Sequence, residues 1–188
     1  MSKTLYSLTV ALALAAGVAQ TPAQTVNSAA SELVFVTRQM GVPVEGRFQR
    51  WSAQVALDPR KPEAAQVVLR IQMDSVAFAA PEVTAEAQRP VWLDTAKFPQ
   101  AVFQSKAIRP AGNGRYEMTG SLTLKGESHE MVVPVTLAQN SSSATASGNF
   151  TVKRSDYRIG EGEWTDDSLV AHEVQVRFRI ALSGLPTS

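Results

Sequence analysis

The residues best suited to chemistry are few and stand far apart in this chain. The two histidines, His129 and His172, are each followed by a glutamate, and there is no cysteine. A zinc site normally takes three or four ligands, so two separated histidines give it little support. Asp94 and the Asp166-Asp167 pair could act as acid and base, but their segments favour solvated loops. The sequence therefore predicts no catalytic residue, no metal site and a protein that is not an enzyme.

Two adjacent basic residues, Lys153 and Arg154, are the candidates for contact with a charged head group. Arg154 is the stronger candidate, because a guanidinium presents a planar fork of donors that matches a carboxylate or phosphate. The alternative is a structural ion pair with Asp156 or another carboxylate. Adjacent residues of a strand face opposite sides, and this favours the structural alternative.

β-Strands must position these residues, because alternating patterns run through most of the chain. In residues 115–125 and again in residues 174–182, apolar side chains occupy every second position, which indicates one dry and one wet face. Other strands are expected at 33–37, 44–57, 66–73, 101–108, 131–137 and 144–152. The turns between them are mostly short, so neighbours should pair antiparallel. The prediction is an all-β fold, an eight-stranded antiparallel barrel.

One segment breaks the alternation and predicts a single short helix. Residues 81–89 begin with Pro81, a favoured residue in the first helical turn, and end before Pro90. Glu82 at the start and the spacing of Glu86 and Arg89 suit a helix of this length.

The dry faces of the strands are the candidate walls of a ligand site. An eight-stranded barrel has an interior just wide enough for packed side chains or for one small ligand. Trp92, beside the helix, and Trp164, in a long loop, could line the mouth. The alternative is that the inner side chains simply fill the barrel. The wall candidates are Leu69, Ile71, Met73, Phe103, Tyr116, Met118, Leu122, Met131, Val133, Val176 and Phe178.

The first 23 residues have the layout of a secretory signal. Lys3 precedes an apolar run at residues 5–18, and small residues at 17–23 offer cleavage positions. We therefore expect residues 1–23 to be a cleaved signal peptide and residues 24–188 to form a single domain. Loss of Lys3 from the 18 basic residues would balance the 17 acidic ones. A nucleic-acid partner is not expected, because such proteins usually carry a basic excess.

Three stretches, in this order, resemble the YceI family of lipocalin-like, polyisoprenoid-binding periplasmic proteins. Residues 98–105 (FPQAVFQS) are similar to a family segment with an aromatic residue before proline. Residues 120–126 (GSLTLKG), followed by 132–135 (VVPV), resemble a second motif, and residues 150–157 (FTVKRSDY) resemble a third. The chain departs from the family pattern in two places: residues 89–94 lack a histidine that many members have, and Arg158 stands where glycine is common.

The resemblance implies a lipocalin-like barrel that holds a lipophilic small molecule, with isoprenoid quinones, polyprenyl phosphates and fatty-acid derivatives as the ligand classes. No cofactor is expected beyond such a bound lipophile, a polyprenyl compound or a quinone. The leading hypothesis is a periplasmic binding or carrier protein. The alternative is a non-catalytic accessory protein with a filled barrel that binds a membrane or electron-transfer partner transiently. The sequence does not predict the oligomeric state.

The signal-peptide interpretation makes a direct prediction about the mature chain. The mature N-terminus should lie near Gln20 or Gln24, and the protein should appear in the periplasmic fraction. Mass-spectrometric sequencing of the N-terminus measures this. Met1 at the start of the abundant cellular form would contradict the interpretation.

Overall fold

The computed structural model describes residues 24–58, 61–140 and 143–184, so the expected signal peptide lies outside the described residues. In the described part of the chain, ten strands form one antiparallel sheet with the order β3-β4-β6-β7-β8-β9-β10-β1-β2-β5. The strands are β1 (Thr25–Gln39), β2 (Val42–Phe48), β3 (Trp51–Ala56), β4 (Gln66–Gln72), β5 (Val76–Phe78), β6 (Gln100–Gly112), β7 (Arg115–Leu124), β8 (Glu127–Asn140), β9 (Ser143–Lys153) and β10 (Glu173–Ser183).

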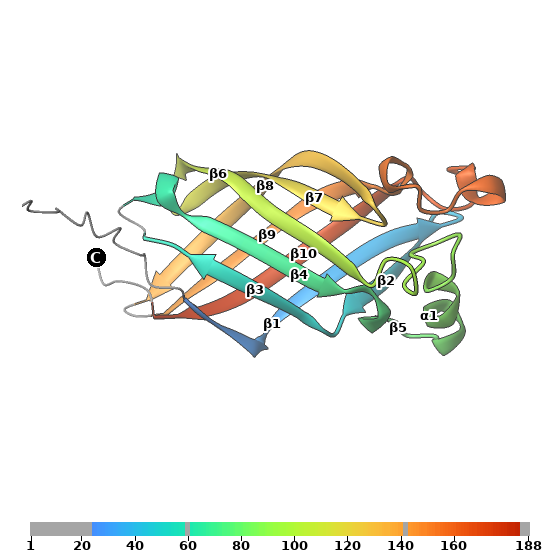
Figure 1. Cartoon of the computed structure of the whole chain (residues 1–188), viewed down its shortest axis with the longest axis horizontal. Coiled ribbons are helices and arrows are strands. Elements are labelled where there is room, and N and C mark those ends of the chain that lie inside the picture. Colours follow the sequence, from blue (N-terminus) through green and yellow to red (C-terminus); the bar gives the residue numbers. More distant parts are fainter. Residues whose placement is uncertain (1–23, 59–60, 141–142, 185–188) are drawn as a thin grey trace, which may run out of the picture.

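The sheet curls round an interior and gives the molecule a barrel-like shape (Figure 1). β3 stands at one end of the strand order, yet it follows β2, near the other end, after only Gln49 and Arg50. An isolated antiparallel bridge between Gln24 and Val55 also brings the start of β1 to β3. The all-β, antiparallel class predicted from the alternation is therefore correct.

The predicted count of eight strands is wrong, because one expected strand is divided and one strand was not predicted. The expected strand at 44–57 is split at Gln49 and Arg50, and a 3-10 turn at Met73–Ser75 separates β4 from β5, which lies beyond the expected strand at 66–73. Ser75 explains both breaks. Its buried hydroxyl accepts a hydrogen bond from the Arg50 backbone N–H at 3.0 Å and donates to the Gln72 carbonyl at 2.6 Å. A side chain that bonds the backbone in this way competes with the regular ladder.

Opposing inner side chains fill one end of the curled sheet. Val55, Leu57, Ile108 and Leu182 are buried and belong to one hydrophobic cluster. The Gln24 side chain is buried beside them, and its Oε1 accepts a hydrogen bond from the Leu57 N–H at 2.7 Å. This end is therefore packed, and a polar group within it has a partner, as buried polar groups require.

The irregular elements gather at the opposite end (Figure 1). They are α1 (Pro81–Ala87) and the 3-10 turns η3 (Arg154–Tyr157) and η4 (Gly162–Thr165); the other 3-10 turns are η1 (Pro62–Ala64) and η2 (Met73–Ser75). The expected short helix is thus present, two residues shorter than predicted. No helix in the described part of the chain is long and apolar enough to cross a membrane.

The assignment of inner and outer faces can be tested on β7. Met118→Arg should place an unpaired charge on the inner face, where Met118 is 9% exposed, and lower the free energy of unfolding by about 3 kcal/mol or more. Glu117→Arg, on the outer face, should cost about 1 kcal/mol at most, through its cross-strand neighbour Arg109. Urea denaturation of both variants measures the difference. Equal losses would show that the face assignment is wrong.

Candidate ligand-binding cavity

The half of the interior next to the irregular elements is hollow. It holds a cavity of about 630 Å³, within the range of small-molecule sites. The residues that line it are overwhelmingly apolar and come from the inner face of the sheet, α1 and the loops around η3 and η4. The structure brings most of the predicted wall residues together here: Leu69, Ile71, Met73, Trp92, Phe103, Met118, Leu122, Met131, Val133, Trp164, Val176 and Phe178.

Tyr116 is the predicted wall residue that does not line the cavity. It lies on the same face of β7 as Met118 but packs against the larger hydrophobic cluster, opposite Val135. Alternation along a strand identifies the face on which a side chain lies. It does not give the height along the barrel at which packing ends and the cavity begins.

Sequence reasoning missed the contribution of β1 and its neighbours to the cavity wall. The Phe35 ring lies 5.3 Å from the Phe48 ring and 5.5 Å from the Phe78 ring, centroid to centroid, and all three line the cavity. Phe35 lies across Gly46 of β2, where a Cβ would come within 2.4 Å of the ring. The alternation of Leu33, Phe35 and Thr37 was the available signal.

Two tryptophans from distant segments meet at the mouth of the cavity. The ring centroids of Trp92 and Trp164 are 5.3 Å apart, with the rings tilted by 47°. The Trp92 Nε1–H donates to Glu86 of α1 at 3.1 Å, and Arg89 forms an ion pair with the same carboxylate at 2.8 Å. The hydrogen bond from Arg89 is the main cause that lowers the pKa of Glu86. Glu86 therefore carries a negative charge at the mouth at neutral pH.

Arg154, the head-group candidate, lines the cavity but is 3% exposed, and its own donors are occupied. All five guanidinium N–H groups have backbone carbonyl partners. These are the carbonyls of Ala171 (3.1 Å), Ile159 (2.9 Å), Gly160 (3.0 Å), Trp164 (2.6 Å) and Val170 (2.6 Å). The side chain thus binds the loop that surrounds it.

The guanidinium of Arg154 lies close to the backbone of the loop. Gly160 has a φ of +72°, and a Cβ there would lie 2.5 Å from Nη1 of Arg154, so both the backbone and the space require glycine. Burial lowers the pKa of Arg154, and the charge of Asp167 acts in the opposite direction. The group stays cationic, because an arginine pKa lies far above neutrality.

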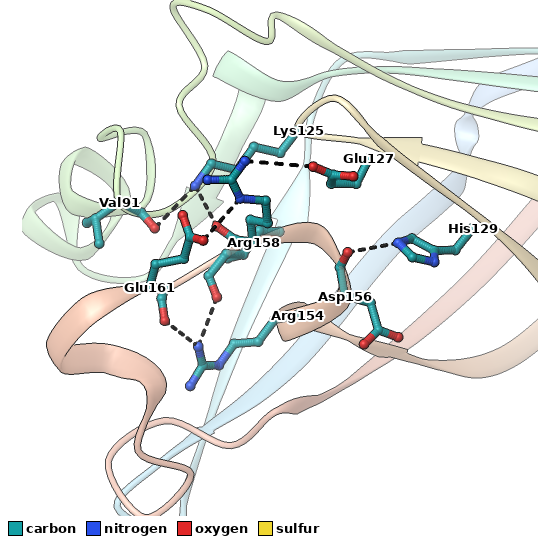
Figure 2. Close-up of polar contacts among 10 residues, drawn as sticks. Val91, Lys125, Glu127, His129, Arg154, Asp156, Arg158 and Glu161 are labelled. Carbon is teal, nitrogen blue, oxygen red and sulfur yellow. Dashed lines mark hydrogen bonds and ion pairs between the residues drawn. The ribbon is translucent and has the colours of Figure 1, made fainter.

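A second polar network joins the turn after β7 to the mouth loops (Figure 2). Lys125 Nζ donates to the carbonyls of Arg158 at 2.7 Å and Val91 at 3.4 Å, and partial burial lowers its pKa. Arg158, in the left-handed region with a φ of 55°, forms an ion pair with Glu161 at 3.0 Å. This network joins three segments at the mouth from outside the cavity: the turn at Lys125, the loop at Val91 and the loop at residues 158–161.

The structure does not assemble the histidines and acidic residues into one site. The Nε2 of His129 lies 2.8 Å from the carbonyl oxygen of Asp156 (Figure 2). The His129 ring packs edge-on against the Tyr157 ring, with 5.0 Å between the ring centroids. Asp166 accepts hydrogen bonds from the backbone and hydroxyl of Ser168 within its own turn. Neither histidine lines the cavity.

The role of Arg154 in holding the mouth loops yields a prediction. Arg154→Met should leave five carbonyls, three of them in buried hydrogen bonds, without this donor and lower the free energy of unfolding by about 3 kcal/mol or more. Arg158→Met is the matched control, since its side chain is 64% exposed and exposed ion pairs contribute little to stability. Chemical denaturation of the two variants measures the difference. A loss no greater for Arg154→Met than for the control would contradict the role.

Comparison with known proteins places this architecture among characterised sequences and structures. Residues 24–182 match the YceI-like domain family. A UPF0312 protein of Shewanella baltica strain OS195 is 31% identical over 137 residues, which cover 71% of this chain and 72% of that protein.

Solved structures share the fold. The crystal structure of BcnA from Burkholderia cenocepacia is 40% identical in sequence, with a TM-score of 0.81, and the match covers 84% of this chain and 99% of that one. A polyisoprenoid-binding domain from Saccharophagus degradans shares the fold at 17% identity, with a TM-score of 0.68 and coverage of 86% and 98%. The family match spans nearly all of the described residues, and this chain belongs to the YceI-like domain family.

Proposed function

We propose that this chain is a periplasmic binding or carrier protein that holds the long apolar part of one lipophilic molecule inside its barrel. The observation that carries the proposal is the cavity of about 630 Å³ with an almost wholly apolar lining. An empty apolar cavity of this size forfeits contacts that side chains or a ligand would make. An apolar ligand restores those contacts and gains about 0.8 kcal/mol for each methylene that leaves water.

The class of ligand is an isoprenoid, a quinone or a fatty-acid-like chain. One solved relative of the same fold is described as a polyisoprenoid-binding domain, which supports an extended hydrocarbon ligand for this chain as well. The cavity wall includes Met73, Met118 and Met131, whose flexible thioether side chains suit an adaptable site. Export by the segment 1–23 and a periplasmic location are part of this proposal.

The alternative, an accessory protein with a filled barrel, receives less support from the cavity. Only the end around Val55 and Leu182 is filled, while the half next to α1 is hollow. We assign no reaction to the protein, because the proposed site presents apolar walls and an arginine whose donors are bound to carbonyls. The bound molecule should therefore be recovered chemically unchanged.

Two alanines of α1 offer a matched test of the proposal. Ala87 lines the cavity near its mouth and is half-buried, whereas Ala85 on the same helix is exposed. Ala87→Trp should obstruct the cavity and weaken the binding of an apolar fluorescent dye by about tenfold or more, the loss of some two buried methylenes. Ala85→Trp should leave the affinity unchanged.

Dye titrations of the purified wild type and both variants measure this effect. Equal affinities for all three proteins would place the dye outside the cavity. A wild type that binds neither the dye nor any long-chain lipid would contradict the proposed function.

A further inference from the structure

A single hydroxyl in the cavity wall has no hydrogen-bond partner among the residues that the structure describes. It is Oγ1 of Thr37, which is buried, with the residue 9% exposed. Thr37 lies on the inner face of β1, on the same side as Leu33 and Phe35, and lines the cavity. Buried side-chain oxygens are nearly always hydrogen-bonded, so an unpartnered one in a ligand cavity points to a partner that comes with the ligand.

The end of β1 that carries Thr37 and the side chain of Arg154 both bond one segment, residues 170–171. The Arg38 carbonyl accepts a hydrogen bond from the Ala171 N–H at 2.9 Å, and Gln39 forms an antiparallel bridge with Val170. Arg154 donates to the carbonyls of Val170 and Ala171. The buried polar side chains of the cavity wall are therefore Thr37, whose hydroxyl has no partner among the described residues, and Arg154, whose donors are already occupied. Gln39, Glu82 and Glu86 also line the cavity but are not buried.

This combination favours a particular kind of head group. Burial of a carboxylate or phosphate requires several donors to replace its lost water, but among the buried side chains of the wall Thr37 offers one and the Arg154 donors face carbonyls. Glu82 and Glu86 of α1 also line the cavity, and carboxylates offer no donor to an anionic head group. A neutral carbonyl needs only one donor, and the nearby guanidinium charge attracts its oxygen.

We propose that the Thr37 hydroxyl is the polar anchor of the cavity and that it selects ligands with a neutral carbonyl head, such as an ester or ketone, over carboxylates and phosphates. The inference rests on the proposed function, which supplies the apolar chain. It adds the head group and its position. Thr37 lies near the β1–β2 turn, at the end of the barrel that carries α1, so the head stays near the mouth and the chain runs toward the packed end (Figure 1).

Three probes of similar length separate the head group from the chain: methyl laurate, dodecane and laurate. Their affinities are measured by competition with an apolar fluorescent dye at neutral pH, where laurate is ionised. Wild-type protein should bind methyl laurate about fivefold to tenfold more tightly than either of the other probes, as one added hydrogen bond provides. Thr37→Val should reduce that advantage over dodecane to less than about twofold and leave dodecane binding unchanged.

Two control variants keep the test specific. Thr37→Ser retains the hydroxyl and should retain the preference for methyl laurate. Thr119→Val removes a hydroxyl from the outer face of β7 and should change none of the three affinities. Thr37→Val should also unfold at a denaturant concentration no lower than wild type, because the substitution is isosteric and removes an unpartnered polar group.

The outcomes distinguish this inference from the proposed function. An undiminished methyl laurate preference in Thr37→Val would overturn the anchor, and laurate as the tightest wild-type ligand would overturn the selection of neutral heads. In both cases dodecane binding would leave the carrier proposal intact. If wild type bound none of the three probes, the proposed function itself would fail, and this inference with it.

Discussion

A β-strand can send only every second side chain to the inside of a curled sheet, so the interior is filled only where opposing side chains reach one another. At one end Val55, Leu57, Ile108 and Leu182 meet that condition and form a packed core. At the other end the sheet encloses more volume than its inner side chains occupy, and the cavity results. The same alternation thus produces both the stability of the packed end and the space for a ligand.

α1 and the loops around η3 and η4 line the hollow end of the barrel. Irregular loops carry backbone carbonyls that do not take part in the hydrogen bonds of a sheet, so these carbonyls need other donors. Arg154 supplies donors to five of them from a single buried side chain. The arrangement places a positive charge in the cavity wall without a free donor, because all five N–H groups of Arg154 bond carbonyls. Burial lowers the pKa of Arg154, but the group stays charged. Arg154 therefore holds the mouth loops and also adds a positive charge to the cavity wall that Thr37 lines.

Where local alternation decides the outcome, most of the predicted strands agree with the structure, the short helix is present, and most of the wall candidates line the cavity. Prediction from the sequence failed where a distant contact decides the outcome. The Ser75 hydroxyl bonds Arg50, where the expected strand at 44–57 is split, and Gln72, where β4 ends, and no pattern within either strand shows this. Tyr116 obeys the alternation but lies beyond the cavity. The carbonyl partners of Arg154 belong to residues 159–171, where irregular backbone gives no period from which contacts can be inferred.

If the hollow half of the barrel contains a lipophilic molecule in the cell, native mass spectrometry of the protein purified from its own cells, without added lipid, should detect it. We expect a single added mass, released by denaturing solvent as one intact long-chain compound. A protein that leaves its own cells without any bound compound, and that still takes up none when incubated with the lipids of those cells, would contradict this expectation.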